Sequence, residues 1–249
     1  MDAEKKENAG RSQNPAIAHV RKKNVALETG KAATAKGAFT KAVLMLAGLF
    51  IASGASCFLT ISPRTLFLLV FAAFGVSIVI CMKPQYTASL AAPYVVMEGM
   101  LLGQIATIQE RLHPGVSVQT LLITLVIAAL VALSYRFQWV MVNELFKSRV
   151  FLVTFGIATV YAIDLVLLIG FDKNVPMIHE SDWKGILASL FVIYVAAMNL
   201  VWDFDDICVL TEKGMPKYYE WFFAFSLVVT LIWLYVEVTQ LIRKILRIV

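Results

Sequence analysis

The stretch Asn199-Leu-Val-Trp-Asp-Phe-Asp-Asp206 places three carboxylates in four positions, at the end of an apolar run that begins at Gly185. At the end of a water-soluble helix, such a cluster would be an ordinary solvated surface. At the end of a helix that spans a membrane, acidic side chains are costly unless they face a cavity, a partner or the interior of a bundle. The stretch therefore predicts a membrane helix that ends in a functional acidic segment.

The composition indicates an integral membrane protein in contact with a lipid bilayer. Of 249 residues, 59% are hydrophobic and only 16% are charged, whereas soluble domains carry about 25% charged residues. The formal net charge is +5. Because eight of the 22 Lys and Arg residues precede Ala38 and most others lie in short loops, the charge indicates membrane topology and predicts no nucleic-acid partner.

Seven apolar runs follow a polar N-terminal segment. Residues 1–38 lack apolar periodicity, so we predict a disordered basic cytosolic tail there. Residues 39–249 are predicted to form one all-α membrane domain, because each run approaches the ~20 residues that cross the hydrocarbon layer. The expected spans are 40–61, 65–82, 89–109, 117–135, 150–171, 185–205 and 219–241.

The distribution of Lys and Arg predicts the orientation. With a cytosolic N-terminus, 15 basic residues lie inside and seven outside, which satisfies the positive-inside rule. The C-terminal Arg243, Lys244 and Arg247 fit this rule less well. Either the last helix crosses and carries them outside, which we favour, or it is re-entrant and they stay inside.

Four spans contain carboxylates, namely Glu98, Asp164, Asp203 and Glu237, and Asp206 lies just beyond the third of these. Estimated depths place Asp203 near the inner boundary and the others progressively further out, as an acidic ladder across the bilayer. Hard cations prefer oxygen ligands, and neighbouring carboxylates share protons. These five residues are therefore candidate sites for protons or Ca²⁺. Solvation of Asp206 at a helix end, and pairing of Glu237 with a basic side chain, remain alternatives.

Helical spacing adds neighbours to these acids. Asn199, Asp203 and Asp206 follow a 4-then-3 spacing and are expected to share a face. Gly99 and Gly103 form a small-xxx-small pair, which predicts close approach of another helix beside Glu98. On the last span, a polar-edged stripe contains Ser226, Thr230, Trp233, Glu237 and Gln240.

Three segments, 92–103 (Ala-Pro-Tyr-Val-Val-Met-Glu-Gly-Met-Leu-Leu-Gly), 199–206 and 216–222 (Pro-Lys-Tyr-Tyr-Glu-Trp-Phe), resemble the bacterial, YccA-like branch of the Bax-inhibitor (TMBIM) family. The resemblance extends over about residues 36–245. It implies seven spans with a cytosolic N-terminus, pH-sensitive Ca²⁺ leak activity, and, for bacterial relatives, modulation of membrane proteases. It also implies the bacterial cytoplasmic (inner) membrane as the location.

The resemblance further implies an acidic pair on the last two helices. Asp203 is in register with the family's first aspartate, and Glu237 resembles the second with Glu in place of Asp. However, a hairpin turn at Gly214–Pro216 predicts that position 203 faces positions 225–226 rather than 237. Asp203 is then expected to pair with another group, unless the last helix is shifted or broken.

Three functions follow from these observations. The first is a pH-sensitive Ca²⁺ leak with intramembrane carboxylates as ion or proton sites and no cofactor. The second is a non-conducting regulator that binds a membrane protease or another integral membrane protein, through the tail and the Gly99/Gly103 face. The third is a proton-coupled transporter, which no inverted repeat supports. Because the sequence lacks hydrolase, zinc-protease and phosphate-loop motifs, no enzyme activity is expected.

Overall fold

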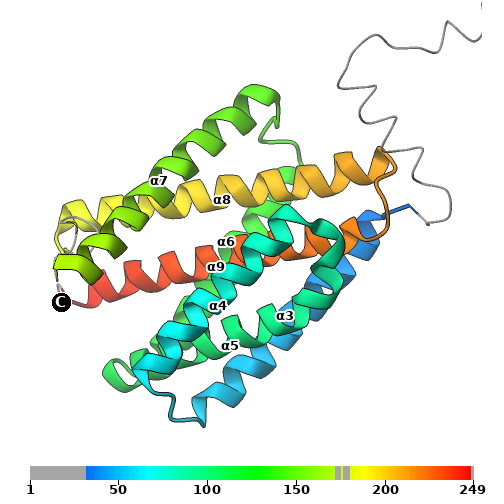
Figure 1. Ribbon diagram of the computed structural model, residues 1–249. Coiled ribbons are helices and arrows are strands. Elements are labelled where there is room, and N and C mark those ends of the chain that lie inside the picture. Colours follow the sequence, from blue (N-terminus) through cyan, green and yellow to red (C-terminus); the bar gives the residue numbers. More distant parts are fainter. Residues whose placement is uncertain (1–31, 172–174, 176–179, 248–249) are drawn as a thin grey trace, which may run out of the picture.

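The structure is a computed structural model that describes residues 32–171, 175 and 180–247 (Figure 1). Within these residues, seven α-helices are long and apolar enough to cross a membrane, and no strand is formed. The predicted seven-helix membrane bundle is therefore confirmed. The elements are α3 (Ala35–Cys57), α4 (Pro63–Met82), the 3-10 helix η2 (Pro84–Tyr86), α5 (Thr87–Leu112), α6 (Val116–Arg136), α7 (Glu144–Phe171), α8 (Trp183–Glu212) and α9 (Tyr219–Leu246).

The bounds of two helices change the placement of predicted segments. Helix α3 begins at Ala35, inside the segment expected to be a tail, and the rest of that segment, 1–31, lies outside the described residues. Helix α8 continues through the acidic stretch to Glu212. The expected end near position 205 is therefore too early, because the backbone stays helical after the apolar run ends. Asp203 and Asp206 lie within the last third of a helix rather than at its end.

The helix ends are set by residues with defined conformational roles. Ser62 caps α4 by accepting a hydrogen bond from the Thr65 amide at 3.2 Å, directly before Pro63 at the first helical position. Gly115 and Gly214 adopt φ values of 88° and 72°, which L-residues with a side chain rarely reach. The turn at Gly115 connects α5 to α6, and the turn at Gly214 connects α8 to α9, so that each pair is antiparallel. The helix ends therefore gather at two ends of the bundle.

We call these the N-terminal end, where α3, α7 and α9 begin and α6 and α8 end, and the C-terminal end, where α8 begins and α9 ends (Figure 1). Helix α9 contacts α3, α5, α6 and α8. Its buried residues include Ala224, Val228, Leu234 and Val238, none of which exposes surface. The last helix is therefore the central element of the bundle, and it is unbroken within its described length.

Helices α3 and α5 approach each other closely through glycine. A Cβ added to Gly99 would lie 2.6 Å from the Cβ of Ala52 and 2.8 Å from the carbonyl oxygen of Leu49. One turn later, a Cβ on Gly103 would meet the backbone of Ser53. This confirms the close helix approach predicted from the small-xxx-small spacing. Because α3 of the same chain covers it, the Gly99/Gly103 face is not available to a partner protein, contrary to our expectation.

Helix α7 lies at the edge of the bundle, beside α8 (Figure 1). Only Val150 among its residues is buried. Its many exposed apolar side chains suit contact with lipid. Clefts between α7 and α8 follow from this loose packing, and one of them is described below.

Candidate functional site: carboxylates of the membrane helices

Asp203 on α8 contacts α9 at the position expected from the hairpin. Ser226 Oγ donates a 2.6 Å hydrogen bond to Asp203 Oδ1. The second oxygen, Oδ2, is buried and has no hydrogen-bond partner among the described residues. A buried polar atom without a partner is costly and uncommon. Asp203 thus presents one satisfied and one unsatisfied oxygen at the interface between α8 and α9.

The next two carboxylates on α8 face α7. Lys147, in the first turn of α7, forms salt bridges with Asp205 at 2.8 Å and with Asp206 at 2.6 Å. Tyr135, at the end of α6, lies 3.5 Å from Asp205 Oδ1. These contacts join the ends of α6 and α8 to the start of α7. Asp205 and Asp206 are therefore paired with a cation, and neither is an isolated solvated side chain.

Asn199 lies one turn before Asp203 but bonds to a different neighbour. Its Nδ2 donates to Thr154 Oγ1 on α7 at 2.7 Å and to the carbonyl of Val195 at 2.9 Å. The polar face predicted for α8 therefore lies at the border between two helices, with Asn199 and Asp206 toward α7 and Asp203 toward α9.

Glu237 is fully inside the bundle, with 1% of its surface exposed. Its Oε1 accepts hydrogen bonds from the Tyr161 hydroxyl at 2.7 Å and from the Trp233 indole at 3.1 Å. Among the described residues, Glu237 forms no salt bridge with a basic side chain, which was the predicted alternative. It also makes no contact with Asp203. The acidic pair implied by the family resemblance is absent from this conformation.

Asp164 and Glu98 occupy two further, separate places. Asp164 Oδ1 accepts a 2.7 Å hydrogen bond from the amide of Val175, in the loop after α7. Glu98 lines a cavity of about 740 Å³ between α4, α5 and α9, together with Ser77 and Gln104. The five predicted residues therefore come from the expected helices, but they do not converge.

No cluster of three or more His, Cys, Asp or Glu side chains able to hold a metal ion occurs in the described part of the chain. A resident metal centre does not follow from this geometry. What the arrangement offers is a series of single carboxylates, each with its own polar partners. Such residues can exchange a proton or contact a passing cation one at a time.

Glu220, in the first turn of α9, forms an ionic contact that the sequence does not predict. It is 3% exposed and accepts hydrogen bonds from the Thr34 amide at 2.9 Å and hydroxyl at 3.0 Å, in addition to a salt bridge with Lys41. The Ala33 amide also donates to the Met215 carbonyl at 2.7 Å. These contacts hold the segment before α3 against the turn between α8 and α9. No local sequence pattern distinguishes Glu220 from an interfacial acid.

Lys244 is expected as a topology charge near the end of the last span, yet only 6% of its surface is exposed. Its ammonium donates to the Gly185 carbonyl at 3.0 Å and to Ser189 Oγ at 2.9 Å, both in the first turns of α8. A basic residue near a chain end normally extends to water. Its burial follows only from the packing of α9 against α8.

Comparisons with known proteins agree with this architecture. No curated protein and no solved structure matches the chain. The family description "Bax inhibitor 1 like" matches residues 3–247, which is nearly the whole chain and includes all seven helices. The chain therefore belongs to the Bax inhibitor 1 like family.

Proposed function

We propose that the protein is a passive, pH-gated cation leak, with Ca²⁺ as the permeant ion and Asp203 as the proton-sensitive group. The observation that carries this proposal is the buried Oδ2 of Asp203, which accepts no hydrogen bond from the described residues. A carboxylate oxygen can be satisfied by taking up a proton or by coordinating a cation. Protons and cations would therefore compete for the same atom.

The position of Asp203 couples this choice to helix packing. The residue lies between α8 and α9, and its other oxygen is held by Ser226. Adding or removing a charge at a buried helix contact alters the relative stability of two packings, which is how proton-driven switches work. Protonation of Asp203 would thus shift α8 relative to the central helix.

The charged residues at the N-terminal end provide the entrance in this proposal. Lys147 bridges Asp205 and Asp206, so the start of α7 closes against α8 while these salt bridges are formed. Separation of α7 would release two carboxylates two and three positions beyond Asp203. Further along the proposed path, the cation would meet single carboxylates one at a time. The candidates are Glu98, Asp164 and Glu237.

The test is Ca²⁺ flux into proteoliposomes as a function of pH, measured with an enclosed fluorescent indicator. We expect the double substitution Asp203→Asn and Asp206→Asn to change both the flux and its pH dependence. Glu212→Gln is the matched control, because Glu212 is an exposed acid at the end of the same helix. A flux-versus-pH curve unchanged in the double variant would refute the proposal.

A non-conducting regulator is the second candidate, and the contacts of Ala33 and Thr34 favour it. These two residues lie where the N-terminal tail meets the bundle, and their contacts hold them against the turn between α8 and α9. A membrane protease bound to the tail would thereby act on these helices. Deletion of residues 1–31 keeps the anchor and removes the tail. Flux should survive this deletion in a leak, whereas a regulator that acts through its tail should lose its effect on the protease.

A further inference from the structure

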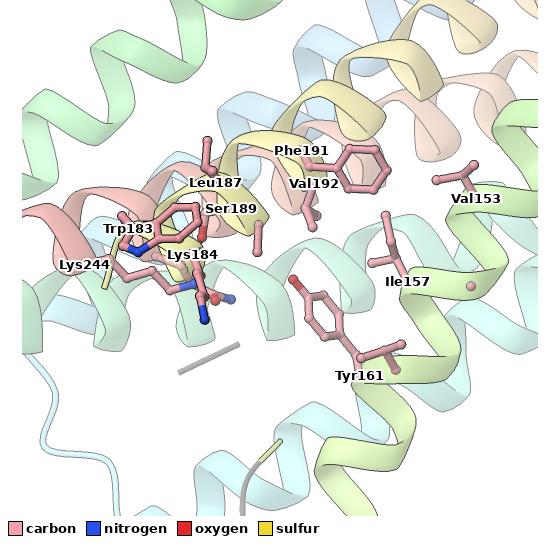
Figure 2. A pocket seen from close by; sticks show the side chains of 14 residues that line it. Val153, Ile157, Tyr161, Trp183, Lys184, Leu187, Ser189, Phe191, Val192 and Lys244 are labelled. Carbon is pink, nitrogen blue, oxygen red and sulfur yellow. Dashed lines mark hydrogen bonds between the residues drawn. The ribbon is translucent and has the colours of Figure 1, made fainter. Parts of the chain in front are cut away.

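A cleft of about 690 Å³ lies between α7, α8 and α9 near the C-terminal end of the bundle (Figure 2). This volume is within the range of about 300–1,000 Å³ typical of small-molecule sites. The cationic end of the cleft lies away from Asp203, the proton-sensitive group of the proposed leak, although Tyr161 in its lining contacts Glu237. Its lining therefore calls for a separate explanation.

The two ends of the cleft differ in chemistry. Figure 2 shows Lys184 and Lys244 gathered beside Trp183 at one end, and Val153, Ile157 and Phe191 toward the other. Among the described residues, the lining contains two lysines and no acidic residue. The site is therefore cationic at one end and apolar along the rest, as an anionic amphiphile requires.

Lys244 is the residue that makes this more than an apolar groove. It is buried apart from 6% of its surface, and its ammonium donates to a carbonyl and a hydroxyl. An ammonium group has three donors, so one remains for a ligand. Among the described residues Lys244 forms no salt bridge. The carboxylates that act on it electrostatically, Glu237 and Asp182, do not contact its ammonium, and Glu237 accepts its hydrogen bonds from Tyr161 and Trp233. A buried cation in a membrane protein is normally compensated by an anion.

The surroundings identify the source of that anion. The cleft lies between helices whose outer surfaces face hydrocarbon, and its charged end is at the ends of α8 and α9, where head groups lie. Lysine ammonium groups bind phosphate as point charges, and the phosphates of lipid head groups are the anions present at the end of a membrane helix. The apolar end also adjoins a second cleft of about 430 Å³, which Val153 and Phe191 line as well, so an acyl chain has room to continue along α7 and α8.

We propose that this cleft binds one anionic phospholipid, with its phosphate at Lys244 and Lys184 and an acyl chain between α7 and α8. Bound there, the lipid fills the gap beside the loosely packed α7 and stabilises its position. This inference is independent of ion conduction, so its test requires no flux measurement.

The first experiment is a lipid titration of the purified full-length protein in detergent, followed by native mass spectrometry. We expect one saturable site that binds phosphatidylglycerol at least ten-fold more tightly than phosphatidylcholine with the same acyl chains. Lys244→Met should remove most of this preference. Arg243→Met is the matched control, because Arg243 is the exposed neighbouring cation outside the cleft. Equal affinity for the two lipids, or equal behaviour of the two variants, would overturn the proposal.

A second variant tests the apolar part and does not depend on the stability of Lys244→Met. Gly156 lines the cleft, and a Cβ added to it meets no atom within 4 Å. Gly156→Leu should therefore fill the cleft without a backbone clash and weaken phosphatidylglycerol binding about ten-fold. Gly170→Leu, on the same helix and equally open but outside the cleft, should not. Unchanged binding by Gly156→Leu, or displacement of the lipid by inorganic phosphate alone, would contradict an acyl-chain site.

Discussion

Ser226 on α9 donates a 2.6 Å hydrogen bond to Asp203 on α8, 23 positions earlier in the chain. This bond satisfies Oδ1, and the other oxygen of Asp203 is buried without a partner within hydrogen-bond distance among the described residues. The Asp203–Ser226 contact stands where the family resemblance implies an acidic pair. The last two helices are therefore joined here by one ionisable group rather than two.

Removal of the Ser226 hydroxyl should take away the donor that now satisfies Asp203 Oδ1. We expect Ser226→Ala to lower the free energy of unfolding by about 1–3 kcal/mol, the cost of an unsatisfied buried acceptor. It should also move the pH dependence of Ca²⁺ flux. Thermal unfolding in detergent and proteoliposome flux measure the two effects. Ser226→Thr keeps the hydroxyl and is the control, so equal effects of both substitutions would contradict the role of the hydrogen bond.

Asp203 and Glu237 should behave as independent groups. Glu237 lies 11 positions after Ser226 on the same helix, or roughly 16 Å along its axis, and it bonds to Tyr161 and Trp233. Effects of residues this far apart add within about 0.5 kcal/mol. We expect a double-mutant cycle with Asp203→Asn and Glu237→Gln to be additive in unfolding free energy. The cycle with Asp203→Asn and Ser226→Ala should be clearly non-additive, and the reverse result would indicate a direct Asp203–Glu237 contact.

These two relationships show how far the sequence can predict the structure. The helices follow from apolar runs separated by Gly and Pro, and the facing of positions 203 and 226 follows from the turn at Gly214. Both depend on neighbours along the chain. The burial of Lys244 and Glu220 depends instead on which helices pack together, because their partners Ser189 and Thr34 are 55 and 186 positions away. The prediction of an acidic ladder uses the depth of each carboxylate in the bilayer. This depth does not indicate toward which neighbouring helix a side chain points.

Lys147 should hold the start of α7 against α8. Its salt bridges with Asp205 and Asp206 are partly exposed, so each contributes less than about 1 kcal/mol to stability and weakens with salt. We expect Lys147→Gln to leave the melting temperature almost unchanged but to increase labelling of a cysteine placed at Val150, the buried residue of α7. Arg149→Gln is the control, because Arg149 lies on the same helix and forms none of the described salt bridges. Equal labelling of the two variants would exclude a closing role for Lys147.

The close contact between Gly37 and Glu220 should be sensitive to a single methyl group. A Cβ on Gly37 would occupy the space of the Glu220 carboxylate, which binds Thr34 and Lys41. Gly37→Ala should displace that carboxylate and destabilise the protein by about 2 kcal/mol, the cost of a lost hydrogen bond to a charged group. Gly54→Ala on the same helix meets no atom within 4 Å and should stabilise it slightly. The opposite order of melting temperatures would contradict this packing.

The contact of α5 with α3 should show a similar contrast, but here backbone rather than a side chain lies opposite the glycine. A Cβ on Gly103 would press against the carbonyl of Ser53, and the Ser56 side chain lies 2.9 Å away. A backbone carbonyl inside a helix cannot turn aside, so α3 and α5 would have to separate. We expect Gly103→Ala to cost about 1–3 kcal/mol, typical of overpacking. The separation should also weaken the 2.6 Å hydrogen bond from Gln104 to the Ser56 carbonyl.

Gly75→Ala is the control for this prediction, because Gly75 lies within α4 and its added Cβ meets no atom within 4 Å. Intrinsic helix propensity alone favours alanine over glycine by up to about 1 kcal/mol at both positions. A lower melting temperature for Gly103→Ala together with an equal or higher one for Gly75→Ala would therefore measure the helix contact itself. If both substitutions stabilise the protein, α3 and α5 do not pack through Gly103, and the small-xxx-small interpretation is wrong.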